Sequence, residues 1–357
     1  MDSPPLRFAR TEDGVTLGYQ MFGSGPVLVW MPSLSNIVAQ WRIPAIRAAY
    51  QALARQVTLV LYDGRGTGSS DRRIDLGDLG VPAHLRDLHA VLDHAGIARA
   101  SLLGYYHATA TAIAFAARRP ERVDRLVLFG GAPRMREAML PAQTQALLSL
   151  IEQDWDLFAD AAAAAWLGWD TGPSNRWTAE AFRTATTAPV AKAWFAAAER
   201  IDVTGDLPRV RAPALVLHRQ GHQQIPVEVF RRLAAALPDA RLVELPGSTP
   251  TLFLEDPAAD LGLVTGFLTT GTVTAVAARS TGTDTRVAGH PLTPRERQVL
   301  GLLPDGDSNA ELARRLGIAV HTVERHLASI YRKIGARGRA DAVAYALRRV
   351  TDFRHPS

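Results

Sequence analysis

The chain has 357 residues, of which 47% are hydrophobic, and this length favours one large and one small packed domain. It contains no cysteine, which excludes disulfides, thiolate catalysis and cysteine-based zinc sites. The net charge of +5 arises wholly from residue 290 onward, where 12 basic residues outnumber 7 acidic ones, because the other 28 basic and 28 acidic residues cancel. Nucleic acid binding is therefore predicted for the C-terminal part alone.

The N-terminal segment 1–10 has neither the basic nor the apolar region of a signal peptide. Apolar runs elsewhere fall short of the ~18 residues that span a bilayer. We expect a cytoplasmic protein that has no membrane partner.

Short apolar runs before residue 269 are predicted to form buried strands, and the stretches between them can hold crossover helices. This alternation is typical of a doubly wound, mostly parallel α/β sheet. Functional groups in such sheets lie beyond the carboxyl ends of the strands. The predicted strands are Val27–Trp30, Val57–Tyr62, Ala100–Leu103, Arg125–Phe129, Ala214–Leu217 and Arg241–Glu244.

Three motifs near these strands resemble the α/β-hydrolase fold: DGRGTGSS at 63–70, GYYHA at 104–108 and LEDP at 254–257. The resemblance covers residues 7–268 and implies a helical cap at about 135–207. In that family the turn from strand to helix reads G-x-S-x-G, and small flanking residues let a strained backbone expose the serine nucleophile. Gly104 and Ala108 keep the small flanks, but Tyr106 stands at the serine position.

The other positions of the catalytic triad also depart from the resemblance. His222 stands where the family has its acid, and Pro250 stands where it has the general-base histidine. A Ser-His-Asp mechanism needs a nucleophile, a base and an orienting acid. A phenol with an ordinary pKa of about 10 is a poor nucleophile without a base. We therefore predict a pseudo-hydrolase, without cofactor or metal, that senses a small and largely apolar ligand.

A ligand pocket is predicted beneath the cap, since apolar pockets with a few polar groups bind small organic molecules. Two alternatives stay open for its residues: the tryptophans could simply fill core, and Tyr106 could plug the former active site. The predicted pocket residues are Ser33, Leu34, Tyr105, Tyr106, His107, Trp155, Trp166, Trp169, Trp194, His222 and Pro250.

Two other functions compete with ligand sensing. One is a hydrolase or lyase with an unorthodox centre around Tyr106, His107 and His222, fused to a regulatory DNA-binding domain. The other is a ligand-free dimerisation scaffold.

Residues 269–289 are rich in Thr, Gly, Ala and Ser and are predicted to be a flexible linker before a domain at 290–354. Thr293 and Ser308 each precede a glutamate by three residues, which is the spacing of a capping box that starts a helix. The segment 317–320 is a glycine-containing turn of the length found in helix-turn-helix motifs. In the following helix, an apolar stripe of Val323, Leu327, Ile330 and Ile334 lies beside a basic stripe, which suits a major groove.

Over about 60 residues, these motifs resemble the LuxR-type four-helix DNA-binding domain. LTPRER at 292–297, SN at 308–309, KIG at 333–335 and RGRADAV at 337–343 carry the resemblance. It implies a transcription regulator that binds double-stranded DNA as a homodimer. The implied DNA-binding residues are Ser308, Asn309, His321, Thr322, Glu324, Arg325, His326, Ser329, Arg332, Lys333 and Arg337, and the implied dimer contacts are Val343, Ala344 and Leu347.

Three positions depart from this second resemblance. Ala310 and Glu324 stand where the family usually has lysines, and Ala319 replaces a capping serine. Fewer phosphate contacts predict weaker DNA binding with a flatter salt dependence.

Overall fold

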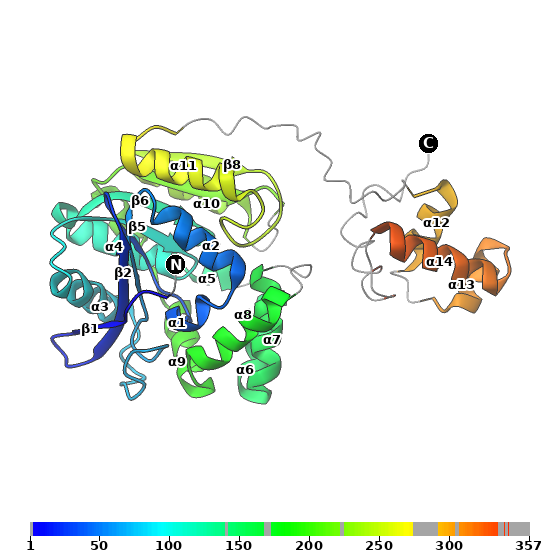
Figure 1. The fold of residues 1–357 in the computed structure, drawn as a ribbon, viewed down its shortest axis with the longest axis horizontal. Helices are drawn as coiled ribbons and strands as arrows, with labels where there is room; N and C mark the ends of the chain where they lie inside the picture. The colour runs from blue at the N-terminus through cyan, green and yellow to red at the C-terminus, as the bar shows by residue number, and fades with distance from the viewer. Residues whose placement is uncertain are drawn as a thin grey trace. The chain divides into compact units, whose positions relative to one another are not determined.

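A computed structural model describes residues 3–139, 142–167, 173–221, 225–273, 292–303, 307–334, 339 and 342. The chain forms two compact units, Met1–Ala278 and Arg279–Ser357 (Figure 1). No helix within the described ranges is long and apolar enough to cross a membrane.

The described part of the first unit contains one eight-stranded sheet in the order β1-β2-β4-β3-β5-β6-β7-β8. The first two strands are antiparallel to their neighbours, and all later pairings are parallel. The predicted α/β fold class is thereby confirmed. The strands are β1 (Arg7–Arg10), β2 (Thr16–Gly23), β3 (Val27–Trp30), β4 (Thr58–Tyr62), β5 (Ala100–Tyr105), β6 (Val123–Phe129), β7 (Ala214–Arg219) and β8 (Ala240–Leu245).

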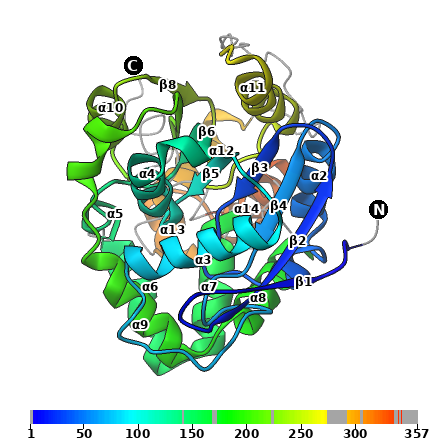
Figure 2. The ribbon, with the colours of Figure 1, turned by 90° about the vertical axis from the view of Figure 1, so that its left-hand side faces the viewer.

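Helices cover both faces of the sheet (Figure 2). On one face, α1 (Ile37–Gln40), α2 (Pro44–Leu53) and α11 (Pro257–Thr270) share a hydrophobic core with the strands. On the other face, the core includes α3 (Val81–His94), α4 (Ala108–Arg118) and α10 (Val227–Ala236). Every residue of β5 is buried because both faces of this central strand are covered. Two 3-10 segments, η1 (Pro120–Arg122) and η2 (Thr204–Arg209), complete this unit's framework.

The segment between β6 and β7 is helical, as expected of a cap. Its helices enclose a separate hydrophobic cluster that contains Leu34, Leu79, Ile151, Phe158 and Trp194. The five helices of the described cap residues are α5 (Arg136–Met139), α6 (Ala142–Gln153), α7 (Trp155–Leu167), α8 (Pro173–Ala185) and α9 (Ala188–Glu199).

The second unit contains α12 (Pro294–Leu302), α13 (Asn309–Leu316) and α14 (Val320–Ile334). Both predicted capping boxes are present, one at Thr293 and one at Ser308. Gly317 ends α13 in the left-handed region with φ +62°, where a glycine has no Cβ penalty. Val323, Leu327 and Ile330 are buried in this unit's core, as predicted.

Several predictions concern residues outside the described ranges. They include most of the proposed linker 269–289 and the dimer residues Val343, Ala344 and Leu347. These predictions stay untested.

Candidate functional site

Tyr106 lies at the tight turn between β5 and α4, and its φ of +48° is in the left-handed region. Such a conformation costs a residue with a Cβ roughly 1–2 kcal/mol. Neighbouring glycines make room for the turn: a Cβ added at Gly131 would lie 2.2 Å from the Tyr106 carbonyl oxygen, and one at Gly130 would lie 3.0 Å from its ring. The backbone therefore has the strained shape of a nucleophile elbow.

The phenol of Tyr106 makes a hydrogen bond to the backbone near β8. Its hydroxyl donates to the Pro250 carbonyl at 2.6 Å. The hydroxyl of Tyr105 donates to the same oxygen at 3.3 Å and accepts from the Leu252 amide at 3.0 Å. Burial raises the pKa of both phenols well above the ordinary value, so neither ionises near pH 7.

A buried ion pair also holds the loop of residues 246–253, which contains Pro250. Arg219, at the end of β7, donates to the Pro246 carbonyl at 2.9 Å and pairs with Asp260 of α11. Asp260 also accepts from the Phe253 amide at 2.8 Å. Arg219 and Asp260 are each 1% exposed, so this loop is held by a fully buried ion pair. Sequence reasoning missed both residues, although an arginine two positions after the apolar run Ala214–Leu217 was a usable signal.

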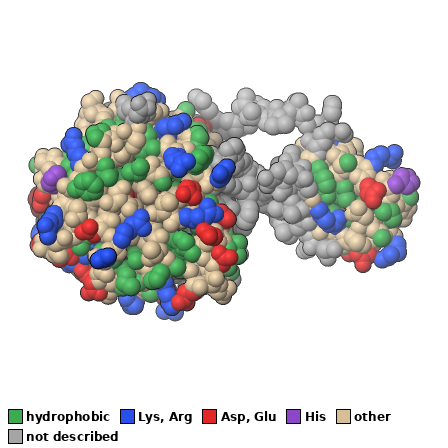
Figure 3. Space-filling view, turned by 60° about the horizontal axis from the view of Figure 1, so that its bottom comes forward, with side chains coloured by type: hydrophobic (Ala, Val, Ile, Leu, Met, Phe, Trp, Pro, Cys, Tyr) green, Lys and Arg blue, Asp and Glu red, His purple; other side chains and the backbone are tan. Residues whose placement is uncertain are grey.

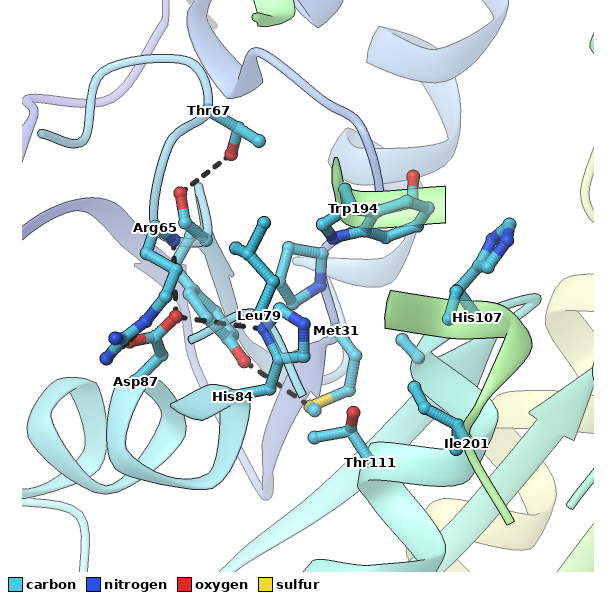
Figure 4. A pocket seen from close by; sticks show the side chains of 16 residues that line it. Met31, Arg65, Thr67, Leu79, His84, Asp87, His107, Thr111, Trp194 and Ile201 are labelled. Carbon is cyan, nitrogen blue, oxygen red and sulfur yellow. Dashed lines mark hydrogen bonds and ion pairs between the residues drawn. The ribbon is translucent and has the colours of Figure 1, made fainter. Parts of the chain in front are cut away.

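A cavity of about 30 Å³ lies where β3, β4, α3, α4 and α9 approach one another (Figure 4). This volume is enough for one or two water molecules. Ser33, His107 and Trp194 are the predicted pocket residues that line it. A second cavity of about 20 Å³ is lined by Tyr105 and again by Ser33.

Arg65 and Asp87 form the polar wall of the larger cavity. All five N–H groups of Arg65 are used: Nε and Nη2 donate to Asp87 at 3.0 and 2.8 Å, Nη1 and Nη2 to Asp13 at 2.9 and 3.3 Å, and Nη1 to Asp78 at 3.1 Å. Burial opposes ionisation of Asp87, but the nearby His84, 3.9 Å away, and the hydrogen bonds from Arg65 outweigh it and lower the pKa of Asp87. Sequence reasoning did not identify this network.

His107 forms another part of the cavity wall. Its ring packs against Trp194 and Phe195, with centroid separations of 4.4 and 5.4 Å. Burial, and to a lesser extent the charge of His84, lowers the pKa of His107 to about 3, so the imidazole is neutral at physiological pH. Its Nε2 atom is buried and has no hydrogen-bond partner among the described residues.

In the second unit, α14 presents polar side chains to solvent. His321, Glu324 and Arg325 are exposed, while Thr322 and His326 are half-buried. Ser329 and Lys333, predicted to belong to the same DNA-facing stripe, both donate to the Glu296 carboxylate at 2.7 Å. The structure thus gives these two residues an internal role that the sequence analysis did not foresee.

Residues 26–257, more than half of the chain, match the family described as alpha/beta hydrolase fold. The chain belongs to this family. Residues 290–346 match the family described as bacterial regulatory proteins, luxR family. A luxR-family DNA-binding domain is therefore joined to an alpha/beta hydrolase domain, and both predicted resemblances are confirmed.

Hydrolases are among the similar proteins. The putative carbamate hydrolase RutD of Caulobacter sp. (strain K31) is 27% identical over 223 residues, which cover 61% of this chain and 83% of that protein. A hydrolase structure from Pseudomonas aeruginosa PA01 has a TM-score of 0.63 at 25% identity, covering 75% of this chain and 99% of its own. The structure of the enol-lactonase from Burkholderia xenovorans LB400 has a TM-score of 0.62 at 23% identity. The match covers 74% of this chain and 100% of the enol-lactonase chain.

Within the alpha/beta hydrolase domain, the predicted pocket residues fall into separate groups. Tyr105, Tyr106 and Pro250 meet at the elbow, whereas Ser33, His107 and Trp194 line the larger cavity. Leu34 is buried in the cap cluster, and Trp155 stacks on Phe158 of that cluster, as in the core-filling alternative. His222, Trp169 and the side chain of Trp166 lie outside the described residues.

Some predicted DNA-binding residues of the luxR-family domain make contacts within the domain, and others lie outside the described residues. Ser308 caps α13, and Asn309 accepts a hydrogen bond from Arg339 at 3.0 Å. The side chain of Arg332 and the whole of Arg337 lie outside the described residues. The DNA contacts assigned to these positions stay predictions.

Proposed function

We propose that this protein is a transcription regulator whose alpha/beta hydrolase domain senses a small, largely apolar molecule and does not hydrolyse it. The observation that carries this proposal is the hydrogen bond between Tyr106 and the Pro250 carbonyl. The phenol stands at the position of a nucleophile, and its hydroxyl donates to the backbone of the residue at the position of the base. A hydroxyl used in this way, with a raised pKa, is a poor nucleophile.

The charge distribution supports DNA binding by the second unit alone. Basic and acidic side chains are interspersed on the face of the first unit that Figure 3 shows, in keeping with its nearly equal numbers of basic and acidic residues, 26 and 27. We propose that α14 enters the major groove of double-stranded DNA and that Arg325 is a principal contact. We also propose that the protein acts in the cytoplasm as a homodimer. Ligand binding would then bias the dimer between DNA-competent and incompetent states.

Two measurements on the full-length protein test the proposal. In filter-binding with upstream DNA, we expect a specific complex at moderate salt, and the absence of such a complex would refute the regulatory part. On a panel of esters, lactones and carbamates, we expect no turnover by the wild type. We also expect none by Tyr106→Ser, because Pro250 cannot supply a general base.

A catalytic function is the second candidate, and the name of the relative RutD, a putative carbamate hydrolase, favours it. In that case a centre around Tyr106 and His107 would perform the reaction. A pKa of about 3 makes His107 too weak a base to take the proton of Tyr106, whose own pKa is raised by burial, and this argues against such a centre at pH 7. Turnover that Tyr106→Phe abolishes would establish it and would overturn the sensor proposal.

A further inference from the structure

The helix α14, for which a place in the major groove is proposed above, has an exposed face with little net charge. Its exposed residues among the described side chains are spaced three or four positions apart, which places them on one side of the helix. Only Glu324 and Arg325 among them carry a permanent charge, and the two charges cancel. This face therefore needs contacts other than attraction to phosphate. The exposed residues are Val320, His321, Glu324, Arg325 and Ala328.

Val320, the first residue of α14, is an exposed apolar side chain. It is 42% exposed, and no other large apolar residue in the described part of this unit is exposed. Val320 is not among the DNA-binding residues that the luxR resemblance implies. It lines an open hollow of about 550 Å³, which lies between α13 and the start of α14.

The hollow is apolar because of residues particular to this chain. Its lining includes Ala310 and Ala319, at the positions where the luxR resemblance leads us to expect a lysine and a serine. Arg314 is the one charged side chain that lines it. An apolar surface therefore stands where more polar contacts to DNA were expected.

Arg314 favours nucleic acid over an apolar protein segment as the partner of this surface. Its side chain is 73% exposed, and its acidic neighbour Glu311 is 4.0 Å away, at the limit of an ion pair. The guanidinium group is thus accessible to a phosphate. A cation beside an apolar surface matches a nucleotide, which carries a phosphate as well as the edge of a base.

The major groove of DNA presents one apolar group. Every base pair offers hydrogen-bond donors and acceptors there, and thymine adds a methyl group at C5. The side chain of Val320 neither donates nor accepts a hydrogen bond, so it cannot bind a phosphate or a polar base edge. The first residues of the second helix in a helix-turn-helix motif contact base edges, and Val320 occupies that position.

We infer that Val320 contacts the 5-methyl group of a thymine in the major groove and thereby determines the base at that position. The inference rests on the proposed DNA-binding function and deepens it, because it names a base that the protein recognises. Burial of one methyl group corresponds to about fourfold in affinity. In a homodimer on two half-sites, both thymines together account for about fifteenfold.

Replacement of thymine by deoxyuridine tests the contact, because deoxyuridine lacks only the 5-methyl group and forms the same base pair. Specific DNA is first selected from a random pool with the full-length protein, and each of its thymines is then replaced singly. In filter-binding, we expect the wild type to lose about fourfold in affinity at one thymine of each half-site. Equal affinity of the wild type for thymine and deoxyuridine at every position would overturn the inference.

Val320→Ala connects the sensitive thymine to this residue. We expect this variant to bind the thymine DNA about fourfold more weakly per half-site, and to distinguish thymine from deoxyuridine there by less than about twofold. Val38→Ala is the matched control, because Val38 is 43% exposed and lies in the first unit, and it should behave as the wild type does. If Val320→Ala retains the full preference for thymine, another residue contacts the methyl group and the inference fails.

The same measurements separate this contact from the function on which it rests. If a specific sequence is selected but none of its thymines depends on Val320, the contact is refuted and DNA binding stands. If Val320→Ala weakens binding to random DNA as much as to specific DNA, Val320 contacts the DNA backbone, which also refutes the inference. If no specific sequence is selected, the proposed regulatory function fails and the contact fails with it.

Discussion

Replacing Tyr106 with phenylalanine removes one hydroxyl and preserves the ring that fills the elbow. The lost bond is the one to the Pro250 carbonyl at 2.6 Å. We expect the free energy of unfolding to fall by about 1 kcal/mol, the usual net contribution of one hydrogen bond. Urea denaturation of the full-length protein, followed by tryptophan fluorescence, measures this change for the first unit.

Tyr105→Phe is the matched comparison for this prediction. Its hydroxyl donates to the same carbonyl and also accepts from the Leu252 amide, which would be left buried without this partner. A loss of about 2 kcal/mol is expected, since an unsatisfied buried donor costs more than an average bond contributes. If Tyr106→Phe were as stable as the wild type, the phenol would have no structural role at the loop.

The residue-scale features differ in how far the sequence predicts them. The small flanks Gly104 and Ala108 predict the strained turn, and the structure contains it at Tyr106. The partner of the phenol was not predictable, because a backbone carbonyl 144 positions away has no sequence signature. The cavity beside His107 was missed for the same reason, since its walls come from five separate elements.

At the scale of elements, α12 and α14 are joined by a buried charged group. Glu296 completes the capping box of α12 and accepts from Ser329 and Lys333 of α14, and it is only 4% exposed. Glu296→Gln removes the charge from these bonds, and we expect a local loss of about 2 kcal/mol. Hydrogen exchange of the α12 amides in the full-length protein measures the loss.

Glu311 provides the control, because it occupies the same position in the capping box of α13 but is exposed. Glu311→Gln should reduce protection less than Glu296→Gln does. Equal effects of the two substitutions would mean that capping alone, and not the pairing with α14, determines the stability of the unit.

The contact of Glu296 with Ser329 and Lys333 predicts that the stability of α12 depends on pH. Burial acts to raise the pKa of Glu296, but hydrogen bonds from Lys333, Thr293 and Ser329 outweigh it and lower the pKa to about 2. A depressed carboxyl pKa stabilises the folded state above the unfolded value of about 4.5, and this stability is lost as pH falls toward 2. Protection of the α12 amides should therefore decline below about pH 4.5 in the wild type, and this decline should be smaller in Glu296→Gln.

Elements with an apolar run were predictable, and those without one were not. The six predicted strands correspond to β3 to β8, with ends that differ by at most two residues. The strands β1 and β2 were missed, because β1 lies at the sheet edge with mostly exposed residues and β2 contains glycines and a buried glutamine. Edge strands need little hydrophobic surface, so their pattern is weak.

At the scale of the whole molecule, the proposed ligand response requires a DNA affinity that a ligand can change. Glu324 lies exposed on α14 directly before Arg325, where the luxR resemblance leads us to expect a lysine. A carboxylate at this position repels phosphate, so the wild type should bind DNA weakly and with a flat salt dependence. We propose that such binding relies on a homodimer, which would give the alpha/beta hydrolase domain a way to control it.

Substitutions at Glu324 and Arg325 test how α14 contacts DNA. We expect Glu324→Lys to strengthen binding to all sequences and to steepen the slope of log K against log salt by about one unit, as one added phosphate contact would. Arg325→Ala should instead cost ~1–3 kcal/mol for the specific site alone, provided that Arg325 contacts a base. Filter-binding at several salt concentrations, with specific and random DNA, separates the two effects. A slope that Glu324→Lys leaves unchanged would place this face of α14 away from the phosphates, and the groove assignment would then have to be abandoned.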